Sequence, residues 1–526
     1  MGRIKCNDRD QIFMYAKTLG DQLGGAHEVH KFVQLINLTN VDSFLKRYSK
    51  IGGKVYHPRV MLSVLIYGYH RGWRSSRELQ RACEENDAMR YLVGGYRIKF
   101  RAIADFRVRF TKEIGEVFKA NVADLMLKKA NLGKLIKADG TKIKSSAAND
   151  QTYTKKSLEA KKTAIQKDIL EYLKQGIEQD IKDDELLGRE NLGSEISDEE
   201  FKKVIAELAK NQKKARGKEL QEKPRKPREE PSPDQSESER DEQPTLFAMA
   251  LKYAKINNAL TKHADAKPET NINLTDTDSK FMKRNGLTGQ SYNVQAASSE
   301  GYIVAIDIAT NNAENDLEQL SPIIDQTIAN TGTIPSEVLV DAGYFHESSL
   351  EYIFEKDIEG FIPCPRQIAK ERRGEADSGY EPHYFRINED DDYLICPEGK
   401  KLEFENEIVS ASKKSTVYRA NLQDCVVCAK RNACCTSERD QKSGRRQIEI
   451  GNAADLKHAM IHKMKTDAAK LTYKKRGAEI EPIFGVIKTA KRFREFVVRG
   501  TEKVRVETKL IAIAMNFGKM IREGLI

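Results

Sequence analysis

A basic, proline-rich stretch from Lys223 to Pro233 places the strongest constraint on the fold, because prolines at this density interrupt helices and strands alike. Helical patterns dense in Lys and Glu precede it at 155–175 and 198–216. We therefore expect residues 151–245 to form an inserted, charged helical arm that ends in a disordered linker. A dimer contact and a simple spacer are both open as its role.

Charge is distributed unevenly along the 526 residues, whose formal net charge is +10. Residues 1–150 carry +13 and residues 453–526 carry +9, whereas 151–250 and 251–452 carry −3 and −9. Two basic regions on either side of an acidic middle indicate a polyanionic partner. Solvated basic helices without a partner are the alternative.

Hydrophobic residues make up 39% of the chain, which is enough to build packed cores and excludes a wholly disordered protein. No run approaches the roughly 18 to 20 apolar residues that a membrane span needs, and the first residues lack a signal-peptide core. Eight cysteines are too few for a disulfide scaffold. We expect a soluble cytoplasmic protein without a membrane partner.

Several helices are predicted near the start of the chain. His57-Pro58 leads into an apolar helix that ends at Gly72, and a second helix follows from Ser75 to Gly94. Their short connection is typical of a helical hairpin.

Arginines surround these two helices, with Arg74 and Arg77 at their junction. A basic helical pair favours DNA binding, and we interpret residues 1–130 as a helical DNA-binding domain. Helical hairpins that never touch DNA are the alternative. A longer helix from Ile103 to Lys129 is expected to close the domain.

An alternation of apolar and polar residues in segment 131–150 predicts the first strand of a catalytic sheet. Further strands and helices follow in segment 246–365, which we interpret as the catalytic core. The predicted strands are Gln290 to Ala297, Tyr302 to Ala309, Glu337 to Asp341 and 360–362, and the predicted helices are Leu317 to Ala329 and Ser348 to Glu355. Consecutive strands followed by alternating helices and strands indicate a mixed sheet in an α+β or α/β fold.

Three acids lie at positions typical of a catalytic site. Asp139 lies inside the apolar alternation of the first strand, where a carboxylate costs free energy unless a positive group binds it. Asp341 ends an apolar strand, where open sheets place their sites, although a turn or cap role is the alternative. Glu481 lies beside an apolar helical face in the C-terminal helix region, 451–526. Three carboxylates can hold two Mg²⁺ or Mn²⁺ ions about 3.5 to 4 Å apart and support phosphodiester chemistry.

Four motifs contain or lie near these acids. They are Asp139-Gly140-Thr141-Lys142, Ser291-Tyr292-Asn293-Val294-Gln295, Val340-Asp341-Ala342-Gly343-Tyr344 and Glu481-Pro482-Ile483-Phe484-Gly485-Val486-Ile487-Lys488. In this order they resemble the motifs of bacterial insertion-sequence transposases of the DDE class. The run from His57 to Arg107 resembles the helical N-terminal domain of that family, and the run from Arg499 to Asn516 resembles its C-terminal end.

The resemblance implies an RNase H-like catalytic domain in which Asp139, Asp341 and Glu481 bind two divalent ions. Such a domain cuts DNA at the transposon ends and joins the freed 3′-hydroxyl to target DNA. Glu479 is a rival for the third acid; we choose Glu481 because Pro-Ile-Phe-Gly follows it and Lys488 stands at the spacing found in the family.

Three further residues near the third acid are implied to contact DNA phosphates, namely Tyr473, Arg476 and Lys488. Related enzymes act as dimers on paired ends, so the expected partners are transposon-end and target double-stranded DNA and a second copy of the chain, in the nucleoid of a bacterial cytoplasm. Two other functions are open: a domesticated or inactive transposase that only binds DNA, and an RNase H-like nuclease without strand transfer.

Segment 366–450 is predicted to form a β-rich insertion, which the resemblance also implies. It holds a cysteine cluster whose C-x₂-C element is typical of a tetrahedral zinc site, with Cys396, Cys425, Cys428 and Cys434 as ligands. Cys435 is a second candidate for the fourth ligand, and unligated thiols are the alternative.

Overall fold

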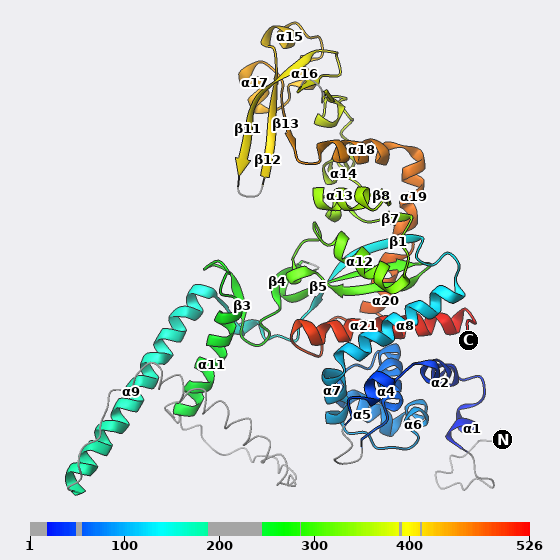
Figure 1. The fold of residues 1–526 in the computed structure, drawn as a ribbon, viewed down its shortest axis with the longest axis vertical. Helices are drawn as coiled ribbons and strands as arrows, with labels where there is room; N and C mark the ends of the chain where they lie inside the picture. The colour runs from blue at the N-terminus through cyan, green and yellow to red at the C-terminus, as the bar shows by residue number, and fades with distance from the viewer. Residues whose placement is uncertain (1–17, 49–54, 188–244, 285, 389–391, 411–412) are drawn as a thin grey trace, which may run out of the picture. The chain divides into compact units, whose positions relative to one another are not determined.

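The computed structural model describes residues 18–48, 55–187, 245–284, 286–388, 392–410 and 413–526 (Figure 1). The chain divides into two compact units. The first combines Met1–Ser146 with Ser291–Ile526, and the second is formed by Ala147–Gln290. The chain therefore leaves the first unit after one strand and returns to it within another.

Eight helices precede the first strand in the part of the chain that the structure describes. They are α1 (Leu19–Leu23), α2 (Glu28–Leu38), α3 (Asp42–Leu45), α4 (Pro58–Arg71), α5 (Ser76–Glu85), α6 (Asp87–Val93), α7 (Phe100–Arg109) and α8 (Thr111–Lys128). Pro58 opens α4, and Gly72 ends it in the left-handed conformation, with φ 80°. Ser75 caps α5 by accepting a hydrogen bond from the backbone N of Glu78.

Two of the predicted helices are each divided in the structure. The second predicted helix becomes α5 and α6, because Asn86 leaves the helical conformation and its side chain caps α6 by accepting from the backbone N of Met89. The third is interrupted at Phe110, whose φ of −108° and ψ of 41° separate α7 from α8. Neither break was predicted, because apolar residues keep their helical spacing across both positions.

The main sheet has the strand order β6-β5-β1-β7-β8, and β4 also pairs with β5. Its strands are β1 (Leu135–Lys144), β4 (Lys280–Arg284), β5 (Leu287–Ser299), β6 (Tyr302–Ile308), β7 (Glu337–Leu339) and β8 (Glu359–Phe361). The strands β6, β5 and β1 are antiparallel neighbours, whereas β1, β7 and β8 are parallel. This arrangement is that of an RNase H-like sheet and confirms the predicted α+β fold with its helical N-terminal region.

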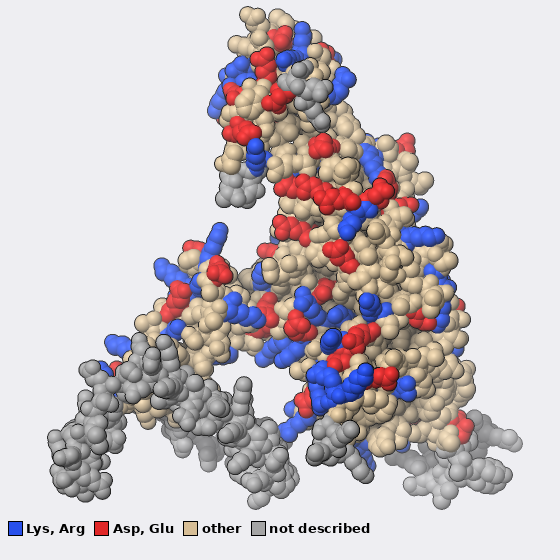
Figure 2. All heavy atoms as spheres, viewed as in Figure 1, with Lys and Arg blue, Asp and Glu red and all other residues tan. Residues whose placement is uncertain are grey.

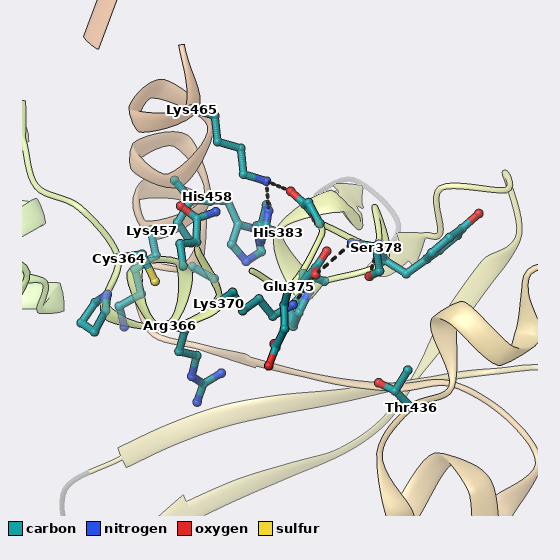
Figure 3. A pocket seen from close by; sticks show the side chains of 18 of the residues that line it. Cys364, Arg366, Lys370, Glu375, Ser378, His383, Thr436, Lys457, His458 and Lys465 are labelled. Atoms are coloured by element: carbon teal, nitrogen blue, oxygen red, sulfur yellow. Dashed lines mark hydrogen bonds and ion pairs between the residues drawn. The ribbon is translucent and has the colours of Figure 1, made fainter. Parts of the chain in front are cut away.

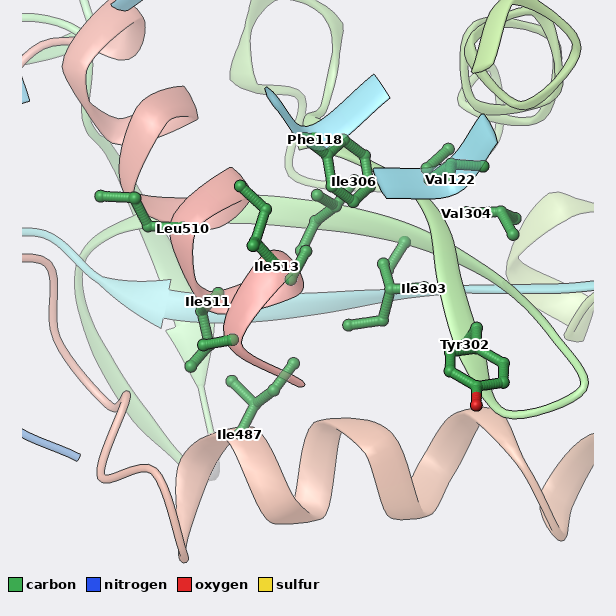
Figure 4. Packing of buried hydrophobic residues seen from close by; sticks show 14 of the residues in the cluster. Phe118, Val122, Tyr302, Ile303, Val304, Ile306, Ile487, Leu510, Ile511 and Ile513 are labelled. Carbon is green, nitrogen blue, oxygen red and sulfur yellow. The ribbon is translucent and has the colours of Figure 1, made fainter. Parts of the chain in front are cut away.

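Helices from distant parts of the sequence share one core with the sheet. The helices α12 (Leu320–Thr331) and α21 (Thr501–Arg522) contact β6, and α21 also contacts α4 and α8. Figure 4 shows Phe118 of α8, Ile306 of β6 and Ile513 of α21 in this core. Full burial of such a side chain stabilises the fold by about 1.5 to 3 kcal/mol.

A second sheet of the first unit has the strand order β13-β12-β11-β10-β9. Its strands are β9 (Arg386–Asn388), β10 (Tyr393–Ile395), β11 (Lys401–Ser410), β12 (Lys413–Ala420) and β13 (Gln447–Gly451). Short helices lie before and within it: α13 (Glu347–Glu355), α14 (Pro365–Arg372), α15 (Leu422–Val426), α16 (Arg431–Cys434) and α17 (Glu438–Ser443). The helices α18 (Ala454–Lys465), α19 (Asp467–Gly477) and α20 (Ile480–Lys488) then lead to α21. The β-rich content expected of segment 366–450 is thus present.

The second unit has its own small core. The helices α9 (Lys155–Leu187) and α11 (Leu246–Lys262) pack through apolar side chains such as Ile169 and Ile256, and β2 (Thr152–Thr154) pairs with β3 (Asn271–Asn273). The sequence interpretation assigned α11 to the catalytic core, but its apolar face packs on α9 instead. The predicted helix at 198–216 and the proline-rich linker lie outside the described residues.

Acidic and basic side chains mix over the face seen in Figure 2, and Lys and Arg gather where Figure 1 draws α5 and α7. None of the described helices combines the length and the apolar character that a membrane crossing requires.

Candidate active site

Asp139 lies in the middle of β1, and its Oδ1 accepts a hydrogen bond of 2.9 Å from the backbone N of Gly140. A Cβ atom on Gly140 would lie only 2.5 Å from Gln295 Nε2 and 2.6 Å from Asp316 Oδ1. Only glycine fits at this position without a shift of these side chains. The part of β1 beside Asp139 is therefore covered by the polar side chains of Gln295 and Asp316.

Asp341 follows β7 at the carboxyl end of that strand and caps a short 3₁₀ turn, Ala342–Tyr344. Its Oδ1 accepts a hydrogen bond of 2.9 Å from the backbone N of Gly343. The parallel register pairs Lys137 with Leu339, so Asp139 and Asp341 each stand two residues further along neighbouring strands. The fold thus brings the first two predicted acids together.

Arg476 of α19 joins the first acid to the third. Its Nη2 lies 3.0 Å from Asp139 Oδ2, and its Nη1 lies 3.3 Å from Glu481 Oε1. The Arg476 side chain is buried, with 8% exposed, while 60% of the Glu481 side chain is exposed. The guanidinium therefore supplies the positive charge that the buried acid needs.

Glu479 points to other partners. It forms an ion pair with Lys137, and its Oε1 accepts a hydrogen bond of 3.1 Å from Ser298 Oγ. The side chain of Glu481, and not that of Glu479, forms the ion pair with the Arg476 guanidinium.

Burial is the main influence on the two aspartates. It raises the pKa of Asp139 to about 6, against the opposing effect of Arg476 and with a further increase from the Asp341 carboxylate. Burial also raises the pKa of Asp341, while Arg476 and the Gly343 N–H lower it. A further positive charge nearby would therefore stabilise the ionised form of both carboxyls.

The acids match the ligand chemistry of a hard divalent cation, since they offer only carboxylate oxygens. Within the described residues, however, their ligand atoms do not all lie within 4.8 Å of one another. Arg476 stands between Asp139 and Glu481, and Glu481 is the exposed member of the set. A movement of the Glu481 side chain toward Asp139 and Asp341 would complete a three-carboxylate site.

The other residues predicted near the third acid also reach the site. Burial raises the pKa of Tyr473, whose hydroxyl interacts with Arg476. Lys488, at the end of α20, donates to Thr141 Oγ1 on β1. Both side chains therefore lie next to residues that flank Asp139.

A fourth acid, Asp316, was missed by sequence reasoning. Its Oδ1 accepts hydrogen bonds from Asn293 Nδ2, at 2.8 Å, and from Gln295 Nε2. The buried Tyr344 hydroxyl donates to Gln295 Oε1. In sequence, Asp316 stands just before a helix and has the appearance of a simple helix cap. The polar residues Asn293 and Gln295 of the second motif are the sequence signal that could have revealed this network.

The two arginines predicted to bind DNA differ in position. Arg74 is 12% exposed; it donates to the carbonyl oxygens of Arg492 and Glu495 and lies 3.5 Å from the buried Glu507. Arg77 is exposed and stacks over the Phe100 ring at 5.0 Å. Arg77 is therefore available to a ligand, whereas Arg74 joins the N-terminal helices to the C-terminal region.

Five cysteines line one small pocket of the β-rich insertion: Cys396, Cys425, Cys428, Cys434 and Cys435. Burial raises the pKa of Cys434 to about 12, and Arg446 opposes this increase. The thiols do not form a group with all sulfur atoms within 4.8 Å of one another among the described residues. The pocket gathers the predicted ligands without a preassembled tetrahedral set, so the zinc site stays a prediction.

A cavity of about 760 Å³ beside α14 and α18 holds another group of ligand-type side chains, Asp377, Glu381 and His383. Figure 3 shows His383 and Lys465 of this cavity. Lys465 binds both Asp377 and His383, and Lys370 binds Glu381. Burial and the nearby Lys465 lower the pKa of His383 to about 4. The two ammonium groups already satisfy these carboxylates, so this group is not a strong competitor for the divalent ion.

Comparison with known proteins adds two matches. Residues 395–521 match the family described as Transposase DDE domain, and residues 17–109 match the family described as Transposase domain (DUF772). Through these two matches the chain is similar to the insertion-sequence DDE transposases. The first match contains Arg476 and Glu481, and the second contains Arg77. No curated protein and no solved structure matches this chain.

The two matches confirm the predicted family. A DDE domain implies nucleotidyl transfer on DNA with the help of divalent metal. The positions of Asp139 and Asp341 lie outside both matched ranges. Their assignment in this chain therefore rests on their geometry around Arg476.

Proposed function

We propose that the protein cuts DNA at the ends of its own mobile element and joins the freed 3′-hydroxyl to target DNA. The observation that carries this proposal is the meeting of Asp139, Asp341 and Glu481 around Arg476, on an RNase H-like sheet of a chain with two transposase matches. Asp139, Asp341 and Glu481 would hold two Mg²⁺ or Mn²⁺ ions. Ions bound there would help to activate the attacking oxygen and to stabilise the leaving oxygen of a phosphodiester.

The chain itself supplies the groups that surround this chemistry. Arg476, which is charged at all relevant pH values, would be free to hold a phosphate oxygen when Asp139 serves as a metal ligand. Tyr473 interacts with Arg476, Lys488 donates to Thr141 beside Asp139, and both offer further donors to the DNA backbone. Arg77 and the basic helices around it would bind the transposon ends, and two copies of the chain would hold a pair of ends.

The test uses purified full-length protein and DNA that carries the element's ends next to flanking sequence. With Mg²⁺ or Mn²⁺ we expect cleavage at the ends and products in which the element's 3′ end is covalently joined to target DNA. Asp139→Asn should abolish both, and Asp325→Asn, an exposed acid on α12, should leave both unchanged.

The pattern of products separates the alternatives. Cleavage without joined product would favour a hydrolytic nuclease. End binding without cleavage in either metal would favour a protein that only binds DNA.

A further inference from the structure

A buried polar network connects the part of β1 that carries Asp139 with the turn that Asp341 caps. Asp316 Oδ1 accepts from both Asn293 Nδ2 and Gln295 Nε2, and Gln295 Oε1 accepts from the Tyr344 hydroxyl. Asn293, Gln295 and Tyr344 are almost wholly buried. Low dielectric surroundings strengthen such a network and make each unpaired member costly.

The network directly contacts both segments, β1 beside Asp139 and the turn after Asp341. Gly140, next to Asp139, has no room for a side chain, because Gln295 Nε2 and Asp316 Oδ1 fill that space. Gly343, two residues after Asp341, lies against Asp316 on the other side, with Asp316 Cβ 3.7 Å from the position that a Cβ would take. Tyr344 follows in the same turn and is held by Gln295.

The network is also anchored behind the site. Asn293 Nδ2 donates to the carbonyl oxygen of Ala313 at 3.1 Å, and the backbone N of Asn293 donates to Asn312 Oδ1 at 2.9 Å. The loop from Asn312 to Asp316 is thereby fixed to β5. Asp316 is therefore held in place from one side, and from the other it lies against Gly140 of β1 and Gly343 of the turn after Asp341.

We infer that Asp316 is a positioning residue, which acts through Gln295 and Tyr344 to set the separation of the Asp139 and Asp341 carboxylates for divalent metal. The inference rests on the proposed function of these two aspartates as metal ligands. It assigns Asp316 a hydrogen-bonding role: its acceptor oxygen matters, and its charge is secondary.

Substitutions can separate this role from direct metal binding. Asp316→Asn keeps one acceptor oxygen for the two amides, whereas Asp316→Ala removes it. Tyr344→Phe removes only the hydroxyl at the other end of the network. A matched pair of controls, Tyr352→Phe and Asp325→Ala, breaks a similar contact, Tyr352 to Asp325 at 2.6 Å, away from the site.

The measurement is Mn²⁺ binding to the full-length protein by titration calorimetry and by electron paramagnetic resonance, with the thermal midpoint recorded for each variant. We expect Asp316→Ala and Tyr344→Phe to weaken Mn²⁺ binding about tenfold, the size of effect seen when groups that orient ligands are removed. Asp316→Asn should stay within about threefold of the unmodified protein, and the two controls should not change it.

Each other outcome has a definite meaning. If Asp316→Asn is as damaging as Asp316→Ala while Tyr344→Phe binds normally, the positioning role is wrong and Asp316 is itself a metal ligand. If all three variants bind Mn²⁺ normally, the network has no role in the site. If Asp139→Asn also binds Mn²⁺ normally, the proposed metal centre fails, and that failure is distinct from failure of the inference. Should Asp316→Ala not fold, Tyr344→Phe decides alone.

Discussion

Arg476 Nη2 lies 3.0 Å from Asp139 Oδ2, so a helix near the C-terminal end neutralises an acid on the first strand of the sheet. This contact couples the ionisation of the site to the stability of the fold. Arg476 only partly offsets the burial of Asp139, because the pKa of that carboxyl is still raised to about 6. The metal-free protein therefore carries a destabilising charge at neutral pH.

Asp139→Asn should stabilise the metal-free protein at pH 7. The folded pKa of Asp139 lies above the ordinary value of 3.8, so folding is favoured by protonation and this contribution is lost as pH rises from about 4 to about 6. We expect a gain of about 1 to 3 kcal/mol at pH 7 and almost none below pH 4. Denaturant unfolding in chelator at a series of pH values measures it. A variant equally stabilised at every pH would contradict this account.

The two glutamates near the start of α20 should differ in what they support. Glu481→Gln should reduce DNA cleavage at least about a hundredfold, as expected for a metal ligand, with little loss of stability because the side chain is mostly exposed. Glu479→Gln should leave the buried Lys137 ammonium without a counter-charge and lower the free energy of unfolding by about 2 to 4 kcal/mol. Cleavage assays and denaturant unfolding compare the pair. The reverse pattern would make Glu479 the third acid.

Gly140→Ala should inactivate the enzyme and destabilise it by about 1 to 3 kcal/mol, because the added Cβ overlaps Gln295 and Asp316. Gly485→Ala is the matched control, since open space surrounds that glycine. Thermal unfolding and DNA cleavage measured on both variants test the prediction. An active Gly140→Ala protein would mean that the neighbouring side chains yield easily.

The cysteine pocket should bind one zinc ion per chain if the thiols rearrange into a tetrahedral set. Elemental analysis of protein purified without chelator measures the zinc content. Cys428→Ser should remove the metal, and Cys364→Ala, a buried thiol outside the pocket, should not. Protein that contains no zinc above background would favour free thiols.

Local patterns predicted much of the fold. The alternation around Asp139 and the apolar runs before Asp341 correspond to β1 and β7, because strand periodicity and burial leave a direct mark on sequence. The breaks at Asn86 and Phe110 were not predicted, because hydrophobic spacing continues across them. Asn86 is recognised as a helix cap only in the structure, where α5 ends at this residue and its side chain accepts from the backbone N of Met89.

The acids of the site could be named from sequence, but their surroundings could not. Nothing local indicates that Asp316 lies against Gly140, since the contact depends on how β5 pairs with β1 and how the loop between β6 and α12 returns to β1. The different environments of Arg74 and Arg77 could not be predicted either, because both are arginines at the same helix junction. Only the packing of the folded chain shows that one contacts Glu507 and the other lies over Phe100. Long-range contacts decide these roles, and a single sequence does not record them.

The position of α21 bears on when the enzyme becomes competent during its synthesis. This helix contacts α4, α8 and β6, and Asn516 bonds to both Asn121 and the backbone of Ile303. A nascent chain holds Asp139 and Asp341 long before Arg476, Glu481 and α21 have been translated. The proposed site would therefore form only after the segment that carries Arg476, Glu481 and α21 has been translated, and shorter nascent chains would not cut DNA beside the transcript.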